Sequence, residues 1–114
     1  MNSLENARCD TVKRLFAAYV AQHPDSVGPM LTRDFTFSSP RDDHIDRKRY
    51  FEHCWPKEKV FRDIHIEHLV ADGDDVIVGY RAEKMDGASF RNVELIRFAG
   101  DRIAEVNVYF GRNL

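Results

Sequence analysis

The stretch FRNVELIRFAGDRIAEVNVYFG, residues 90–111, alternates between two kinds of side chain and is interrupted by Ala99-Gly100-Asp101. A period of two is typical of a β-strand, whose successive side chains point to opposite faces of a sheet. The face that is poorer in charge carries the even-numbered residues Phe90, Asn92, Glu94, Ile96 and Phe98. We therefore expect two long antiparallel strands with the even-numbered face, and Glu94 on it, covered by other elements.

The same period extends toward the N-terminus of this stretch. It predicts four strands over residues 60–71, 75–85, 88–98 and 102–111, separated by short Gly-bearing hairpin signals. Their even-numbered faces are again poor in charge: Val76, Val78, Tyr80 and Ala82 in one strand, and Val106, Val108 and Phe110 in another. The result is an antiparallel meander with one concave, covered face.

The hairpin loops decide whether Glu94 is inside. A three-residue loop at Met85–Gly87 with a Gly bulge pairs Lys84 with Ala88 and keeps even-numbered residues together. A similar loop at Ala99–Asp101 then places Glu94 between Val78 and Val106. A strict two-residue Asp-Gly turn would instead place Glu94 outside.

The register of the strand at 60–71 stays open. A two-residue turn at Asp72–Gly73 predicts Asp63, His65, Glu67 and Leu69 on the concave side; a longer turn predicts Ile64, Ile66 and His68 there. The first register makes His65 a candidate pocket residue and leaves the two isoleucines for an oligomer interface.

The N-terminal half reads mainly as helices. Residues 5–23 have helical periodicity, with a stripe of Val12, Leu15, Phe16, Tyr19 and Val20 that ends before Pro24. The pattern then predicts a short helical turn at 25–31, a strand at 34–39, a loop at 40–45, and a helix at 47–55 with Asp46 as N-cap. Helices followed by an antiparallel meander predict an α+β fold.

Glu94 is the candidate functional group of the concave face. Burial among apolar neighbours raises the pKa of a carboxyl group unless a donor stabilises its ionised form, and Asn92 or Tyr80 is placed to donate. An acid, an amide and a phenol in an apolar concavity resemble a small-molecule pocket. The alternative is structural: Glu94 bonds only a backbone end or a helix residue.

Bulk properties exclude several classes. The 114 residues suit a single domain over 1–114, and a net charge of −2 with interleaved signs gives no basic stripe for a nucleic acid. No apolar run reaches the roughly 18 residues of a membrane span. Two separated cysteines form no disulfide framework and indicate reduced thiols in a cytoplasmic protein. No Gly-rich phosphate loop or metal signature is present, so we expect no cofactor.

RDFTFSSP (residues 33–40) and the stretch at 90–111 resemble the nuclear transport factor 2-like superfamily, which includes ketosteroid isomerases, scytalone dehydratases and SnoaL-like polyketide cyclases. The resemblance covers nearly the whole chain. It implies a cystatin-like cone, with N-terminal helices packed on a curved antiparallel sheet. It also implies a homodimer through the outer face of the sheet, where Val93, Leu95, Asn107 and Tyr109 lie.

The isomerase catalytic set carries over only in part. The catalytic base of that family falls on Ser39, whose hydroxyl cannot replace a carboxylate. The acid of the oxyanion hole falls on Glu94, two residues before Ile96-Arg97-Phe98. Its Tyr falls near Leu15 or Phe16, with Tyr19 one turn further along the same face.

Four interpretations of residues 38–56 stay open. In the first, Asp42, Asp43 or His44 supplies the missing base from a loop at the cone mouth. In the second, Asp42, His44 and His53 bind a metal, although their spacing fits no known ligand pattern. In the third, Cys54 is a nucleophile, although its place near a helix C-terminus disfavours a thiolate. The fourth is a solvated loop leading into a helix whose Phe51 and Trp55 close the cone.

Two functions of different class follow. One is a cofactor-free isomerase, cyclase or dehydratase that moves a proton on a small apolar carbonyl compound. The other is a non-catalytic ligand-binding or dimerisation module. The predicted catalytic residues are Glu94, Asp43 and Tyr19, and the predicted ligand-binding residues are Phe16, Trp55, His65, Tyr80, Asn92, Ile96, Val106, Val108 and Phe110. No metal site is expected.

Overall fold

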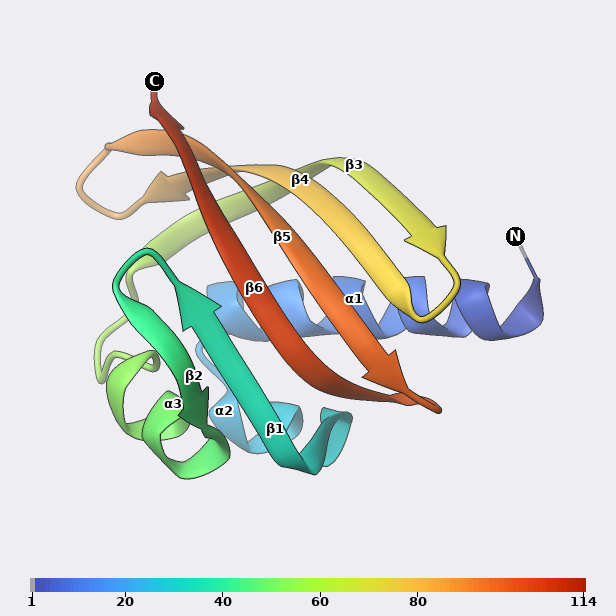
Figure 1. Cartoon of the computed structure of the whole chain (residues 1–114). Coiled ribbons are helices and arrows are strands. Elements are labelled where there is room, and N and C mark those ends of the chain that lie inside the picture. Colours follow the sequence, from blue (N-terminus) through green and yellow to red (C-terminus); the bar gives the residue numbers. More distant parts are fainter. Residues whose placement is uncertain (1) are drawn as a thin grey trace.

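The computed structural model describes residues 2–114 and shows a curved sheet with helices packed on its concave side (Figure 1). The strand order in the six-stranded sheet is β2-β1-β6-β5-β4-β3, antiparallel throughout except for the parallel pair β1–β6. The elements are α1 (Ser3–Ala21), α2 (Pro24–Val27), the 3-10 helix η1 (Gly28–Met30), β1 (Leu31–Ser39), β2 (Asp42–Asp46), α3 (Arg47–His53), β3 (Phe61–Asp72), β4 (Asp75–Lys84), β5 (Ser89–Ala99) and β6 (Arg102–Asn113). The predicted α+β cone is confirmed. No helix within the described residues has the length and apolar character needed to cross a membrane.

Helix α1 is fixed at both ends. At its start a capping box joins Asn2 and Glu5, and each side chain accepts a hydrogen bond from the other residue's backbone N–H. At its end Gln22 takes a left-handed conformation with φ 58°.

Arg8, which the sequence did not single out, is a buried residue of this helix. Its guanidinium donates to the carbonyl oxygens of Gly100 and Gly73, both at 2.9 Å, and so ties the helix to two hairpin turns.

The expected loop at 40–45 is wrong in part, because residues 42–46 form strand β2 against β1. The strand was hidden by its composition: DDHID has one apolar residue, Ile45, and most of its length faces solvent at the edge of the sheet. Asp46 is the N-cap of α3 as predicted, accepting from the backbone N–H of Arg49 at 2.9 Å. The helix ends at His53, two residues before the predicted end.

The β4–β5 loop is the predicted three-residue loop. The backbone N–H of Lys84 donates to the carbonyl oxygen of Ala88 at 2.8 Å, and Gly87 has φ 91°, which favours glycine. The loop pairs Val78 with Glu94 and keeps the even-numbered residues of both strands on the concave face.

The β5–β6 loop differs from the prediction, and the predicted neighbour Val106 is wrong. Ala99 pairs with Arg102 across a two-residue turn, and a bulge near Ala104 then adds one residue to β6. The bulge restores the parity that the short turn would have reversed. Glu94 therefore lies between Val78 and Val108.

Neither register expected for residues 60–71 holds along the whole of β3. The hairpin turn is Gly73–Asp74, and a bulge between Ile66 and His68 leaves Glu67 without a partner in β4. Another bulge, between Phe61 and Asp63, changes the side at the start of the strand. The inward residues are therefore Phe61 before the first bulge, Ile64 and Ile66 between the two, and Leu69 and Ala71 after the second. His65 is exposed, so its placement as a pocket residue is wrong.

Candidate active site

A cavity of about 330 Å³ lies between the helices and one end of the concave face. Its wall is mostly aromatic and aliphatic, with few polar groups, which is typical of sites for small organic ligands. Its lining residues come from α1, the β1–β2 hairpin, the segment after α3, and strands β3 to β6: Phe16, Tyr19, Gln22, Phe37, Arg41, Cys54, Trp55, Pro56, Glu58, Val60, Phe61, Ile64, Tyr80, Phe90, Asn92, Glu94, Val108 and Phe110.

Glu94 is the buried acid of this cavity. Only 5% of the residue is exposed. Its Oε2 accepts a hydrogen bond of 2.6 Å from the Tyr80 hydroxyl, while its Oε1 is buried and has no hydrogen-bond partner among the described residues. Burial raises the pKa of Glu94 to about 7, and the bond from Tyr80 offsets part of that rise. The carboxyl group is thus divided between its two protonation states near neutral pH.

Strand pairing explains why Tyr80, and not Asn92, is the donor to Glu94. Tyr80 on β4 lies directly opposite Asn92 on β5, so its long side chain reaches diagonally to the carboxyl group two residues further on. The Asn92 amide nitrogen lies 3.4 Å from the Tyr80 oxygen, and the Asn92 Oδ1 accepts from the backbone N–H of Gly111 at 3.0 Å. Asn92 therefore orients the phenol that orients the acid.

A second pair of phenols lies on the helical side of the cone. The Tyr19 hydroxyl is hydrogen-bonded to the Tyr50 hydroxyl, and the Tyr19 ring stacks on Trp55 with centroids 4.7 Å apart. Burial, above all, raises the pKa of both tyrosines well above 10. Both phenols therefore stay neutral near pH 7 and act as hydrogen-bond donors. Tyr50 is fully buried, and it was not among the residues predicted for the site.

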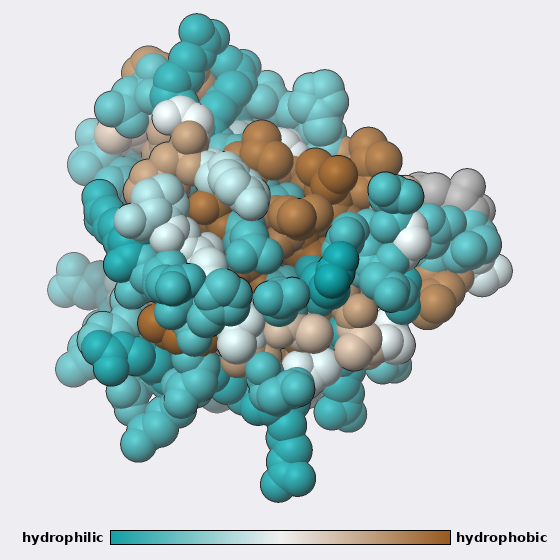
Figure 2. Space-filling model, viewed as in Figure 1, coloured by the Kyte–Doolittle hydropathy of each residue, from teal (hydrophilic) through white to brown (hydrophobic). Residues whose placement is uncertain are grey.

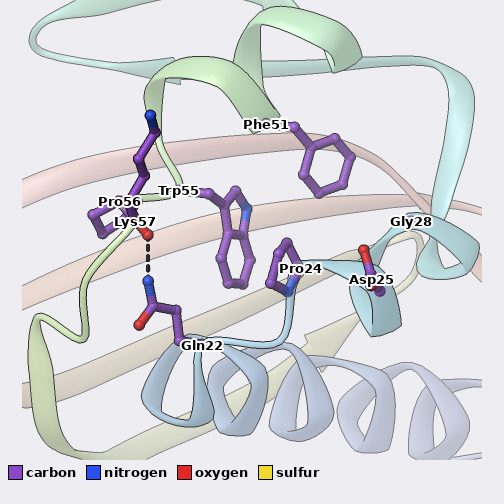
Figure 3. Close-up of a pocket in the computed structure, with 8 residues that line it drawn as sticks. All are labelled: Gln22, Pro24, Asp25, Gly28, Phe51, Trp55, Pro56 and Lys57. Carbon is purple, nitrogen blue, oxygen red and sulfur yellow. Dashed lines mark hydrogen bonds between the residues drawn. The ribbon is translucent and has the colours of Figure 1, made fainter.

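Trp55 also lines a second, open hollow of about 850 Å³, whose lining residues are drawn in Figure 3. Gln22, Trp55 and Pro56 line both spaces, and the Gln22 side chain donates a hydrogen bond to the Pro56 carbonyl oxygen. The charged groups of the outer hollow, Asp25 and Lys57, are exposed. Because the buried acid lines only the inner cavity, we place the candidate site there.

The predicted residues divide into two groups. Those that line the cavity are Phe16, Tyr19, Trp55, Tyr80, Asn92, Glu94, Val108 and Phe110. Ile96 and Val106 do not line it: they lie opposite each other in the sheet and are fully buried in the core, beyond the end of the cavity. Their assignment as ligand-binding residues is therefore not supported by their position.

The residues proposed from the 42–44 segment lie outside the cavity. The Asp43 side chain is 93% exposed and pairs with His44 at 2.6 Å, because β2 is an edge strand and not a loop folded over the mouth. Within residues 2–114, no cluster of His, Cys, Asp and Glu is suited to hold a metal ion. Cys54 does line the cavity, but burial raises its pKa to about 11, so the thiol stays protonated.

Sequence reasoning missed Arg41 and Glu58, which are exposed residues that also line the cavity. The Arg41 guanidinium lies over the Phe110 ring, 5.6 Å from its centroid. Both residues lie in segments between helices and strands, where the sequence has no helical or strand periodicity from which the direction of a side chain could be predicted.

A family model of the SnoaL-like domain matches residues 12–106. No curated protein matches the chain. Similar solved structures include an NTF2-like protein of unknown function from Cytophaga hutchinsonii, 22% identical, with a TM-score of 0.77 over 97% of this chain and 95% of that one. A candidate SnoaL-like polyketide cyclase from Jannaschia sp. CCS1 is 17% identical, with a TM-score of 0.81 over 95% and 88%. An LEH-like epoxide hydrolase of M. tuberculosis is 18% identical, with a TM-score of 0.79 over 94% and 84%. At these identities, the structural likeness shows the fold alone.

Proposed function

Because this chain belongs to the SnoaL-like domain family, we propose that it binds a small, largely apolar carbonyl compound in the inner cavity and that Glu94 transfers a proton on it. The reaction class is a cofactor-independent isomerisation, cyclisation or dehydration. The observation that carries the proposal is the carboxyl group of Glu94, buried in an apolar cavity with Oε1 unpartnered.

The geometry supports different roles for the two carboxylate oxygens of Glu94. The Tyr80 hydroxyl holds Oε2, which leaves the lone pairs of Oε1 for a ligand. In its ionised form, Oε1 takes a proton from the carbon next to a carbonyl group. The C–H electron pair forms the C=C bond of an enolate, and negative charge moves to the carbonyl oxygen. Returning the proton to another atom completes an isomerisation.

The developing charge on the carbonyl oxygen needs a neutral donor in a site with little water. We assign this role to the hydroxyl of Tyr19, a residue of α1 that lines the cavity. If Tyr50 donates to Tyr19 within their hydrogen bond, the proton of Tyr19 is available to the ligand. Tyr50 is then a positioning residue.

The test is hydrogen exchange on a probe ketone. 2-Tetralone has acidic hydrogens next to its carbonyl group, and their loss in D₂O is followed by proton NMR. We expect the protein to accelerate exchange, with a rate that rises with pH through about 7 as Glu94 ionises. Glu94→Gln should abolish the acceleration, and Glu67→Gln, on the outer side of the sheet, should leave it unchanged. Equal acceleration by the Glu94→Gln protein would remove Glu94 from the mechanism.

One observation favours a second candidate, a module that holds a ligand without chemistry. Ser39 stands where the resemblance places a base, and Asp43 lies outside the cavity, so Glu94 is the only buried carboxyl group among the described residues. Binding of 2-tetralone without accelerated exchange would support this candidate.

We also propose that two copies of the chain associate through the outer face of the sheet. Ile77, Val93 and Tyr109 are each at least 40% exposed on this face, and Val93 pairs directly with Tyr109. Figure 2 has the same view as Figure 1, with the sheet in front of α1, and it shows apolar side chains gathered over the middle of this face. An exposed apolar patch of this kind is typical of an interaction surface.

A further inference from the structure

We infer that the ligand of the inner cavity carries a carboxylate group, which Arg41 binds at the cavity mouth while the apolar body extends inward toward Glu94. The inference rests on the proposed function and names the substrate class: a small amphipathic acid instead of a wholly apolar molecule. Arg41 is the only cationic residue among the described residues that line the cavity.

Arg41 is held at the mouth by the sheet. It occupies the turn between β1 and β2, where its backbone N–H donates to the Ser39 hydroxyl at 3.1 Å. Its guanidinium lies over the Phe110 ring, a contact that orients the planar group and leaves its N–H donors free at the edge. A guanidinium so placed can bind a carboxylate through two parallel hydrogen bonds.

Arg41 also has no carboxylate partner in the protein. Among the described residues, Arg62, Arg91 and Arg97 each pair with an acid across the strands, at 2.8 to 3.0 Å, whereas no acid lies within 4.0 Å of the Arg41 guanidinium. A cation that borders a cavity and is not paired within the chain is available to an anionic ligand.

The sheet register gives the distance that the ligand must span. Phe110, beneath Arg41, lies opposite Asn92, and the next pair inward on the same face is Glu94–Val108. Successive side chains on one face of a strand are about 6.8 Å apart. A carboxylate at Arg41 and a reacting carbon at Glu94 are therefore separated by one ring or a short chain, which fits a cavity of about 330 Å³.

The acid Glu58 limits the charge of that ligand. It lines the same cavity from the segment after α3, and its negative charge opposes an anion at the mouth. One carboxylate matched to one guanidinium fits this arrangement better than a phosphate dianion. Neutralising Glu58 should strengthen carboxylate binding, and neutralising Arg41 should weaken it.

The test uses 4-phenylbutanoate, its uncharged amide and 3-phenylpropyl phosphate as probes. Trp55 is the only tryptophan of the chain and forms part of the cavity wall, so its fluorescence reports binding directly. We expect the acid to bind more tightly than the amide. Arg41→Gln should raise the Kd of the acid about tenfold or more and leave the Kd of the amide unchanged, as expected for the loss of a charged hydrogen-bond pair. Arg41→Lys should give an intermediate Kd, and Glu58→Gln a lower one.

The matched control is Arg33→Gln, which removes one exposed positive charge from β1 outside the cavity and should leave both Kd values unchanged. Equal binding of acid and amide, each insensitive to Arg41→Gln, would overturn the inference and leave the proposed function standing. Tighter binding of the phosphate than of the acid would overturn the carboxylate assignment. Failure of all three probes to change the fluorescence of the wild-type protein would overturn both proposals.

Discussion

Replacing Glu94 by Gln should stabilise the protein at alkaline pH and have little effect at acidic pH. Glutamine has nearly the shape of a protonated glutamic acid: one oxygen can still accept from Tyr80, and the amide nitrogen replaces the protonated oxygen. The substitution therefore removes the ionised state of the side chain while leaving the packing of the cavity in place.

The direction and size of the effect follow from the pKa of Glu94. Burial raises this pKa from the ordinary value of 4.5 to about 7 in the folded protein. The folded state thus holds the proton more tightly than the unfolded state does. The contribution of this bound proton to the free energy of unfolding is fully present below pH 4.5 and is lost as the pH rises to about 7. At about 1.4 kcal/mol for each pH unit, the loss is on the order of 3 kcal/mol.

Urea unfolding of the wild-type and Glu94→Gln proteins, at intervals from pH 4.5 to 8.5, measures this difference directly. We expect the two free energies of unfolding to be similar at pH 4.5 and the variant to be more stable by about 3 kcal/mol at pH 8. The control is Glu67→Gln: the hydrogen bond from Arg91 lowers the pKa of Glu67 below its ordinary value, so the ionised form is already fully populated over most of this pH range, and the difference between this variant and the wild type should stay nearly constant above pH 5. A difference between wild type and Glu94→Gln that is independent of pH would refute the reasoning, because Glu94 would then ionise as easily in the folded chain as in the unfolded one.

Two further predictions concern the neighbours of Glu94 and the outer face of the sheet. Tyr80→Phe removes the only hydrogen bond that the carboxyl group of Glu94 receives from the described residues, so the pKa of Glu94 should rise further above 7. NMR of the Glu94 carboxyl carbon measures this pKa, and an unchanged value would show that the hydrogen bond does not stabilise the ionised form. Val93→Glu places a charge in the middle of the outer apolar face and should convert a dimer to a monomer in sedimentation equilibrium, whereas a wild-type protein that is monomeric at 100 µM would contradict the proposed association.

The part of the site built on β4 and β5 could be predicted from the sequence because its determinants are local. Alternation assigns the faces of each strand, and the loop Met85–Gly87 joins the strands without changing their parity. Once those two facts are combined, a charged residue within an otherwise apolar face must be buried. That is why Glu94 and its candidate donor Tyr80 could be placed in advance.

The errors in strand register have a common physical cause, which is the β-bulge. A bulge inserts one residue and reverses the alternation beyond it, but no residue type marks its position. In β3 two bulges change the inward side, which is even-numbered only at Ile64 and Ile66, so neither continuous register could be correct and His65 lies outside. In β6 a short turn and a bulge compensate each other, so the face was right while the neighbour of Glu94 was displaced from Val106 to Val108.

The remaining gap concerns the cavity mouth, where segments distant in sequence converge. Arg41 follows Pro40 in a hairpin that the sequence presented as a loop, and it meets Phe110, near the other end of the chain, only because β1 pairs in parallel with β6. A parallel pairing across some 70 residues leaves no local signal in the sequence. Strand periodicity was therefore sufficient to predict that Glu94, the acid of the proposed chemistry, is buried. The position of Arg41, the cation proposed to select the ligand, depends on the long-range topology of the sheet and could be found only in the folded chain.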